Sequence, residues 1–269
     1  MKMTLWPYQT YGDSAQLPVF FLHGFLGAGE DWLRVAQELE GQYFCVLPDL
    51  PGHGKNTDLP IAAPLSFDVL NQGLLALVDH LRLPQVRLVG YSMGGRAALY
   101  FAVHYPERVS SLILESVSPG ITNSDERQAR AAEDDRRAEA IRAEGVEAFV
   151  EHWYTLPLFQ SLKTHPRREE MIARRKGNHP GWVAKAIRDL SPGRQTPVWD
   201  QLPRLEMPVL FVAGSLDEKY TRLGEQIIVR VPLARLAIIP DTGHNVHLEK
   251  PEIFIPLLRE FWLFGICRG

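Results

Sequence analysis

Short apolar runs recur along this chain, and amphipathic stretches of helix length separate them. The runs cover residues 19–22, 43–47, 86–89, 112–114, 209–212 and 236–239. Runs without polar alternation are typical of parallel strands that are buried on both faces of a sheet. Stretches long enough to be crossover helices lie at residues 30–39, 67–81 and 94–105. The alternation predicts an α/β fold with a doubly wound, mostly parallel sheet.

Residues 119–203 interrupt this alternation, because strand-like runs vanish there and the sequence becomes helical and charged. Prolines also punctuate the stretch, at positions 157, 166, 180, 192 and 197. We expect a helical cap over residues 119–203, inserted into a core formed by residues 1–118 and 204–269. Within it, residues 125–147 are dense in Arg, Glu, Asp and Ala, which is typical of a solvated helix with i,i+4 ion pairs.

Composition excludes several classes of protein. With 269 residues, of which 45% are hydrophobic and 23% charged, the chain can bury a substantial core and is neither disordered nor fibrous. A net charge of -3 gives no overall attraction to nucleic acid or to an anionic membrane. The most apolar late stretch, residues 261–267, is far shorter than the roughly 20 residues that cross a bilayer. We therefore expect no nucleic-acid partner and no membrane insertion.

The cysteines and the first residues bear on the compartment. Cys45 lies in an apolar run and Cys267 near the other end of the sequence, which indicates neither a disulfide framework nor a metal knuckle. Residues 1–16 interleave polar and apolar side chains, unlike a signal peptide. We expect a cytoplasmic protein that uses no metal and no organic cofactor. The sequence leaves its oligomeric state open.

A Gly-x-Ser-x-Gly motif spans residues 90–94, between the apolar run 86–89 and a helical stretch. This strand-turn-helix context is the one that the motif requires. The sharp turn strains the serine backbone, and side chains at the flanking glycines would collide with the adjacent strand and helix. A nucleotide-binding turn is the alternative, but the sequence has no Gly-x-Gly-x-x-Gly after its first strand and no Gly-Lys-Ser/Thr. The motif therefore predicts that Ser92 is a nucleophile at a helix N-terminus, where N–H groups favour negative charge.

Such a serine needs a histidine base and an acid that orients the base, in the chain order Ser, Asp, His. Asp217 follows the run 209–212, and His244 follows the run 236–239. Because the carboxyl ends of parallel strands meet at one edge of a sheet, both side chains can reach Ser92. We predict a catalytic triad of Ser92, Asp217 and His244.

Two neighbours compete for these roles. Asp241 could be the acid, but it shares a short loop with His244 and would hardly reach the far nitrogen of that ring. His247 stands three residues after His244, a spacing that could bind a metal, yet no acidic or cysteine cluster accompanies the pair. We therefore prefer Asp217 as the acid and expect no metal site.

The predicted oxyanion hole consists of the backbone N–H groups of Phe25 and Met93. Phe25 follows His23-Gly24 in the loop after the first apolar run, and Met93 directly follows the nucleophile. We interpret His23 as a residue that stabilises its turn, and the tight loop 49–54 as scaffold.

Further motifs extend over nearly all of the chain. They are Gly29-Glu30-Asp31-Trp32, Tyr91-Ser92-Met93-Gly94-Gly95-Arg96, Glu115, Pro119-Gly120, Trp153-Tyr154, Pro157-Leu158-Phe159 and Gly243-His244-Asn245-Val246-His247. Together they resemble the α/β-hydrolase superfamily and, within it, the family of 2-succinyl-6-hydroxy-2,4-cyclohexadiene-1-carboxylate synthases. These are lyases that eliminate pyruvate in menaquinone and phylloquinone biosynthesis. Thr122 departs from the pattern, since some members carry glutamine there, and this leaves the finer substrate contacts open.

The resemblance implies a small-molecule substrate with several carboxylates and a triad that removes a proton from carbon. Arginines of the helical insertion would bind those carboxylates, a role that the resemblance carries to Arg127 and Arg175. The other residues that it places in the pocket are Tyr91, Trp153, Phe159 and, as a further anion-binding candidate, Lys219. For each cation the alternative is an ordinary solvated charge.

Two other functions remain open. A serine carboxylesterase or C–C bond hydrolase of the same fold would use the same triad, although its lid would more often be apolar than rich in arginine. A ligand-binding protein of this fold would sense a molecule without turnover. The intact set of Ser92, Asp217 and His244 argues against a wholly inactive site.

Overall fold

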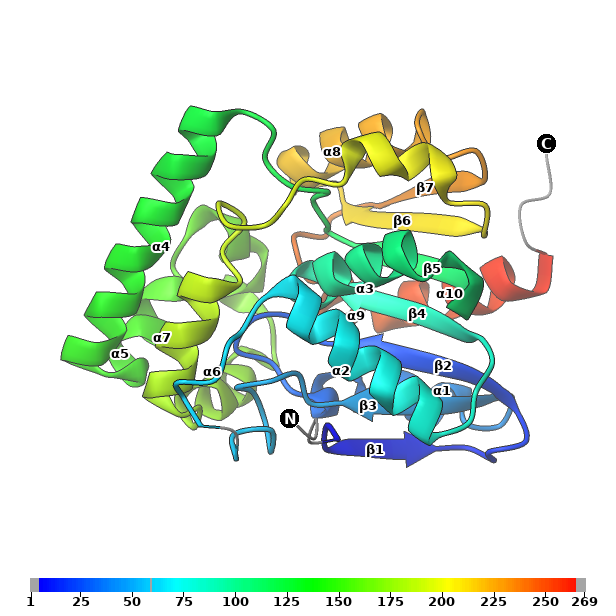
Figure 1. Ribbon diagram of the computed structural model, residues 1–269, viewed down its shortest axis with the longest axis horizontal. Helices are drawn as coiled ribbons and strands as arrows, with labels where there is room; N and C mark the ends of the chain where they lie inside the picture. Colours follow the sequence, from blue (N-terminus) through cyan, green and yellow to red (C-terminus); the bar gives the residue numbers. More distant parts are fainter. Residues whose placement is uncertain (1–4, 59, 265–269) are drawn as a thin grey trace.

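A computed structural model describes residues 5–58 and 60–264 (Figure 1). Its centre is a seven-stranded sheet in the order β1-β3-β2-β4-β5-β6-β7, in which β1 is antiparallel to β3 and every other pair is parallel. The strands are β1 Tyr8–Tyr11, β2 Leu17–Leu22, β3 Tyr43–Pro48, β4 Val86–Tyr91, β5 Val109–Glu115, β6 Val209–Gly214 and β7 Ala234–Ile239. The predicted mostly parallel α/β architecture is confirmed.

Strand β1 lies outside the apolar runs of the sequence. Its four residues, Tyr-Gln-Thr-Tyr, are half-buried or exposed, and it pairs on one side only. An edge strand needs no continuous apolar run because solvent reaches it. The sequence pattern therefore detects the buried strands and misses this one.

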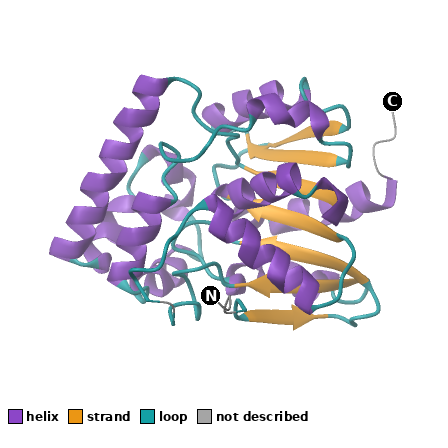
Figure 2. Cartoon of the chain, viewed as in Figure 1, coloured by secondary structure: helices purple, strands orange, loops and turns teal. Residues whose placement is uncertain are grey.

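Helices cover both faces of the sheet, which Figure 2 shows between the two layers. One face carries α1 Leu33–Leu39 and α10 Pro251–Phe264, and the other carries α2 Phe67–His80, α3 Ser92–His104 and α8 Glu218–Ile228. Successive residues of a strand serve opposite faces, so Val19 and Phe21 belong to one apolar cluster and Phe20 and Leu22 to the other. Short helices complete this part: η1 Gly29–Trp32, η2 Pro106–Arg108 and α9 Val246–Glu249.

Between β5 and β6 the chain forms what we term the helical segment, residues 119–203. It contains α4 Ser124–Glu144, α5 Val146–Trp153, η3 Pro157–Thr164, α6 Arg168–Lys176, α7 Pro180–Asp189 and η4 Trp199–Arg204. Helices α4 to α7 gather at one end of the sheet (Figure 1). Their apolar cluster also includes Leu26, in the loop after β2, and Leu248, in the short helix α9 after β7. The segment therefore packs directly over the edge where a site is expected.

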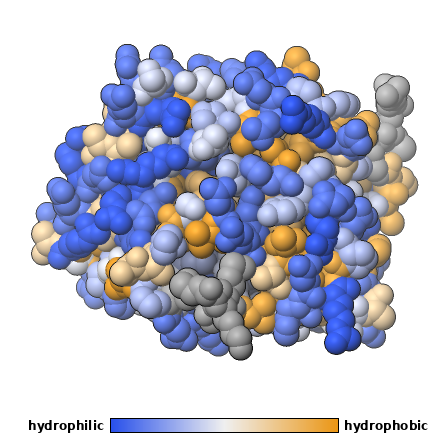
Figure 3. All heavy atoms as spheres, in the orientation of Figure 1, coloured by the Kyte–Doolittle hydropathy of each residue, from blue (hydrophilic) through white to orange (hydrophobic). Residues whose placement is uncertain are grey.

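The expected helix over residues 125–147 is two helices in the structure. Asn123 caps α4 by accepting hydrogen bonds from the backbone N–H groups of Asp125 and Glu126. The helix ends at Glu144, because Gly145 adopts a φ of 89° that a helix cannot continue. Hydrophilic residues dominate the surface at the left of Figure 3, where α4 lies.

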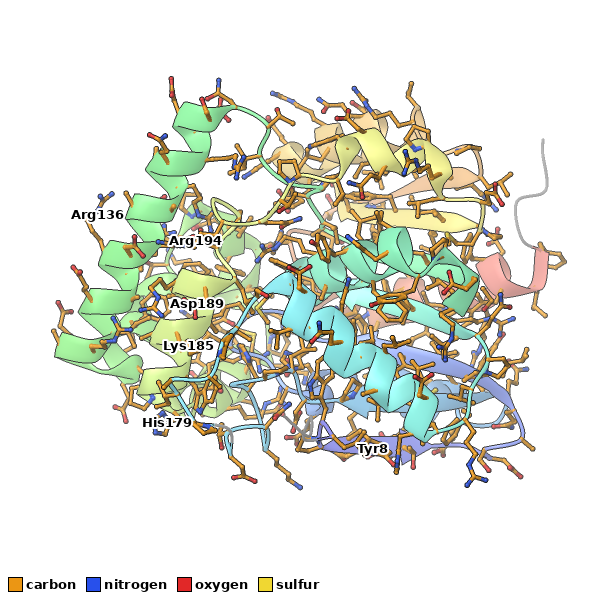
Figure 4. All side chains as sticks on the ribbon, viewed as in Figure 1. Tyr8, Arg136, His179, Lys185, Asp189 and Arg194 are labelled. Carbon is orange, nitrogen blue, oxygen red and sulfur yellow. The ribbon has the colours of Figure 1, made fainter. Side chains whose placement is uncertain are left out.

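Some charged side chains of this segment pair with one another, and others face the solvent. Lys185 and Asp189 of α7 form an ion pair of 2.6 Å, whereas Arg136 of α4 is exposed and points away from the molecule (Figure 4).

No helix within residues 5–58 and 60–264 is long and apolar enough to span a membrane. Cys45 is a buried free thiol, and Cys267 lies outside the described residues.

Candidate active site

Ser92 is the first residue of α3 and occupies the sharp turn that follows β4. Its φ is 50°, in the left-handed region that costs energy for any residue with a Cβ. The turn is possible because its neighbours have no side chains: a Cβ on Gly90 or Gly94 would collide with backbone atoms, and one on Gly95 with Val117. The strained serine and the collisions predicted from the motif are both present.

The structure brings Ser92, His244 and Asp217 together. His244 Nε2 lies 3.1 Å from Ser92 Oγ, and His244 Nδ1 lies 2.7 Å from Asp217 Oδ2. An ionised carboxylate can only accept hydrogen bonds, so Nδ1 of His244 carries the proton and donates to Asp217. Nε2 is then free to accept a hydrogen bond from the hydroxyl group of Ser92. His244 and Asp217 are buried, with 2% and 7% exposure. The competing acid, Asp241, is exposed, and its backbone N–H donates to Ser215 Oγ.

Phe25 and Met93, the predicted oxyanion donors, line the same cavity as Ser92. Met93 is in the first turn of α3, where N–H groups have no acceptor within the helix. Gly24 approaches so closely that a Cβ added to it would lie 3.7 Å from Ser92 Cβ. Phe25 follows it, and within the described residues its N–H donates to no protein acceptor. The segments of both residues therefore adjoin Ser92, and the role of their N–H groups as oxyanion donors stays a prediction.

Two buried histidines organise the loops behind this turn. His23 Nδ1 lies 2.8 Å from the Gly24 carbonyl, and its Nε2 accepts from the Leu50 N–H at 3.0 Å. Burial lowers the pKa of His23 to about 4 and that of His53 to about 3, so both rings are neutral. The contacts of His23 match a role in stabilising its turn.

A cavity of about 270 Å³ opens on Ser92 and His244. Its charged and polar lining comes from helices α3 and α8 of the sheet layers and from α4 of the helical segment: Arg96, Arg130, Asp134, Lys219 and Tyr220. Apolar and aromatic side chains complete it, among them Phe25, Trp153, Leu158 and Ile187. Three cationic groups thus converge on the space in front of the serine.

Two of these cations, Arg96 and Lys219, differ in how the protein surrounds them: Arg96 is hydrogen-bonded on the cavity wall, whereas Lys219 is exposed and lies over the ring of Tyr220. Arg96 Nη1 donates to the Leu190 carbonyl and to Gln195 Oε1, both at 3.0 Å, and burial lowers its pKa to about 10. Burial also lowers the pKa of Lys219, and the nearby charge of Arg130 lowers it further. Because its surroundings disfavour the charged form of Lys219, a bound anion nearby would stabilise that form.

Asp134 is the buried anion that positions Arg130. Its carboxylate is fully buried and accepts from Arg130 Nε at 2.8 Å, Arg137 Nη1 at 2.7 Å and Ser191 Oγ at 2.7 Å. Arg137 also lies over the ring of Trp153, 5.4 Å from its centroid. This network fixes one wall of the cavity.

A second, smaller cavity of about 40 Å³ lies on the other side of Ser92 and His244. Tyr91, Tyr154, Phe159, Arg175 and Asn245 are among its lining residues. Its volume would hold a few water molecules or one very small organic acid.

Arg175, predicted to bind a carboxylate of the substrate, already has a carboxylate partner. Its Nη2 lies 2.6 Å from Asp31 Oδ2, and both side chains are more than nine-tenths buried. Burial alone would lower the pKa of Arg175, but the charge of Asp31 and the hydrogen bond with Tyr154 raise it above its ordinary value. Arg174 also lies 3.4 Å from Asp31. The guanidinium is fixed in the wall of the small cavity with its charge largely compensated.

Of the other residues predicted for substrate binding, Tyr91, Trp153, Phe159 and Lys219 line these two cavities. Arg127 does not line either of them. It lies one helical turn before Arg130, and its carbonyl packs against Gly193. Arg130, three residues later on nearly the same face of α4, lines the larger cavity instead. Substrate binding by Arg127 stays a prediction.

Sequence reasoning gave no role to several residues of the site. Arg96 stood in the motif that contains Ser92, and its place one turn along α3 could have revealed it. Asp31, Asp134 and Tyr220 carried no comparable signal, because their roles depend on partners distant in the sequence. His247 pairs with Glu115, and the described residues contain no group of three or more potential metal ligands.

Known proteins resemble this chain in sequence and in structure. Residues 18–251 match the family described as alpha/beta hydrolase fold. A relative from Bacillus subtilis (strain 168), provisionally named a 2-succinyl-6-hydroxy-2,4-cyclohexadiene-1-carboxylate synthase, is 35% identical over 254 residues, or 93% of this chain and 92% of the relative. A synthase of the same name from Yersinia pestis (strain Pestoides F) is 34% identical over 92% of this chain and 88% of its own.

The solved structure described as MenH from S. aureus superposes with a TM-score of 0.91 at 32% identity, covering 94% of this chain and 97% of that one. The similarity therefore extends over both the sheet and the helical segment. The chain belongs to the α/β hydrolase fold family, and its resemblance to the 2-succinyl-6-hydroxy-2,4-cyclohexadiene-1-carboxylate synthases is confirmed.

Proposed function

We propose that this protein is a carbon–oxygen lyase that eliminates pyruvate from 2-succinyl-5-enolpyruvyl-6-hydroxy-3-cyclohexene-1-carboxylate and releases 2-succinyl-6-hydroxy-2,4-cyclohexadiene-1-carboxylate. The observation that carries this assignment is the convergence of Arg96, Arg130 and Lys219 on the cavity in front of Ser92. A substrate with several carboxylates matches such a lining, because guanidinium groups bind carboxylates in pairs of hydrogen bonds. The synthase names of the relatives support the same reaction.

In the proposed mechanism the triad acts as a base toward carbon. His244 accepts the proton of Ser92 Oγ, Asp217 stabilises the resulting imidazolium, and the serine oxygen removes a proton from the ring of the substrate. The electron pair of the C2–H bond forms a C2=C3 double bond, the pair of the existing C3=C4 double bond shifts to C4=C5, and the C5–O bond to the enolpyruvyl group breaks. The N–H groups of Phe25 and Met93 stabilise the developing oxyanion. The released enolpyruvate takes up a proton and becomes pyruvate, and no water is consumed.

The helical segment has the role of a cap in this proposal. Residues 119–203 place Arg130 and Trp153 over a nucleophile that belongs to the core of residues 1–118 and 204–269. A cavity closed in this way keeps water from competing with the elimination. The cytoplasmic location expected from the sequence stays a prediction.

The test supplies purified protein with the enolpyruvyl precursor and follows pyruvate release and diene absorbance together. We expect both products at equal rates from the wild type and neither from Ser92→Ala. A matched sample with an aryl ester measures hydrolysis by the same serine. If the ester is cleaved while neither pyruvate nor diene forms, the protein is a hydrolase. Tight binding of the precursor without turnover would instead assign a ligand-binding role.

A further inference from the structure

Glu115 and His247 form a buried pair that the proposed mechanism does not use. Glu115 is the last residue of β5 and is fully buried, and His247 is 6% exposed. One carboxylate oxygen accepts from the His247 backbone N–H at 3.1 Å, and the other lies 2.7 Å from His247 Nδ1. A carboxylate this deeply buried is costly unless both of its oxygens are bonded, and here one residue provides both bonds.

The ring of His247 contacts two of the segments that build the site. Trp32, at the end of the first loop, stacks on it with ring centroids 3.8 Å apart and planes 22° from parallel. Tyr91 meets the same ring edge-on at 5.1 Å, and the Tyr91 ring lies 5.4 Å from that of His244. Tyr91 immediately precedes Ser92 and is packed against Gly24 of the first loop. The His247 ring is therefore shared between the loop of the oxyanion donor and the turn of the nucleophile.

Ser116, the residue after Glu115, bonds to His244 at the start of the segment 244–247, which ends with His247. Ser116 has a φ of 54°, and its Oγ donates to the His244 carbonyl at 2.9 Å. A non-glycine residue stays in this conformation only where its surroundings hold it there. Glu115 and Ser116, two consecutive residues at the carboxyl end of β5, thus hold residues 244–247 at both ends: Ser116 bonds to His244, and Glu115 bonds to His247.

We propose that His247 is a positioning residue for the triad, with Glu115 as its anchor. The pair sets the distance between His244 and Ser92 and the placement of Tyr91, although neither residue lines the cavities against Ser92. The inference does not depend on which reaction the triad performs, because it concerns the reactivity of Ser92 itself. It predicts that loosening the pair slows chemistry and leaves substrate binding nearly unchanged.

Three variants separate the contributions of the Glu115 charge, the His247 ring and the His247 hydrogen-bond donor. Glu115→Gln keeps the shape of the anchor and removes its charge. His247→Phe keeps a ring against Trp32 and Tyr91 and removes the donor to Glu115. His247→Asn keeps a donor close to the position of Nδ1 and removes the ring. Leu77→Ala is the control, because Leu77 is fully buried in the last turn of α2, at the end of the sheet opposite the site.

Two rates are measured for each variant: turnover of the enolpyruvyl precursor and labelling of Ser92 by a fluorophosphonate. The second rate reports the nucleophile directly, so it remains informative if the lyase assignment fails. We expect His247→Phe to lower kcat and the labelling rate together, on the order of a hundredfold, since small misplacements at a reacting group have effects of this size. KM should change by less than about threefold. Glu115→Gln and His247→Asn should each lose about tenfold in the same two rates.

Stability is followed by the Tm of every variant. Leu77→Ala should lower Tm and leave both rates at the wild-type level, which shows that loss of stability alone does not reduce reactivity. The inference is overturned if Glu115→Gln and His247→Asn keep both rates within about twofold of the wild type while their Tm falls. The pair would then serve stability only. These two conservative variants decide the question even if His247→Phe does not fold.

Discussion

The triad and the cation-lined wall of the cavity face each other across the same space, yet they are specified in different ways. Ser92, Asp217 and His244 each follow a buried strand, and parallel strands end at a common edge. Arg130 comes from the long helix α4, where each turn offers another candidate about 5 Å further along. The end of a strand determines where a side chain lies along the edge of the sheet. The face of a helix determines only toward which side its residues point, and not which turn reaches the cavity. The triad could therefore be located to the residue, and the arginine only to within a turn.

The largest effect is expected from the region at the strand ends. Ser92→Ala removes the base of the proposed reaction, so kcat should fall by at least about a thousandfold while the fold is retained. Steady-state kinetics, with circular dichroism as the check on folding, measures this. Substantial residual turnover would show that the strand-end residues do not carry the chemistry.

The next effect concerns the stability of the helical segment. Asp134→Ala leaves Arg130 and Arg137 without their buried partner, and we expect the free energy of unfolding to fall by about 3 kcal/mol. Asp135→Ala is the matched control, because Asp135 pairs with Arg194 at the surface and should cost at most about 1 kcal/mol. Urea unfolding distinguishes the two. Equal losses would mean that the buried network does not hold α4.

A pair of substitutions one turn apart tests the position of the binding cation. Arg130→Ala should reduce kcat/KM by about thirtyfold, which corresponds to about 2 kcal/mol of transition-state binding. Arg127→Ala should change it by less than about threefold, because Arg127 lines neither cavity at Ser92. The reverse order of effects would restore the assignment made from sequence.

The smallest effect is a pH dependence of stability that arises behind the triad. Burial lowers the pKa of His53 from 6.5 to about 3, so the unfolded chain takes up a proton first as the pH falls. The stability that the neutral ring contributes is present above pH 6.5 and is lost progressively below it, by about 1 kcal/mol at pH 5.5. His53→Asn should flatten the fall in unfolding free energy between pH 7.5 and 5.5. His80→Asn, on the exposed end of α2, should leave it unchanged.

The sequence was informative wherever a residue's role follows from its immediate neighbours. The parallel strands, the strained turn at Ser92 and the nearness of Phe25 and Met93 to it all follow from local patterns. Strand β1 was missed because its four residues, Tyr-Gln-Thr-Tyr, form no apolar run. The helix over residues 125–147 was predicted too long because a single Gly145 ends it.

Roles that depend on distant partners could not be found in this way. The carboxylate of Asp31 meets Arg175 across 144 positions of the chain, and that of Asp134 meets Ser191 across 57. No spacing rule predicts such contacts, because they depend on how the helical segment packs on the sheet. Arg175 is an example: we expected it to bind a carboxylate of the substrate, whereas in the structure it is bonded to the carboxylate of Asp31, a partner that the sequence does not reveal.

The pair of Asp31 and Arg175 also limits how this enzyme can be rebuilt. It joins the loop of the oxyanion donor to the helical segment, and both charges are buried. An engineer who exchanges residues 119–203 for the corresponding segment of another protein of this fold would leave Asp31 as a lone buried charge. The graft would then need a cation at the position of Arg175, or a neutral residue in place of Asp31. Residues 119–203 can therefore not be exchanged independently of the rest of the chain, and the design of a chimera has to begin with this ion pair.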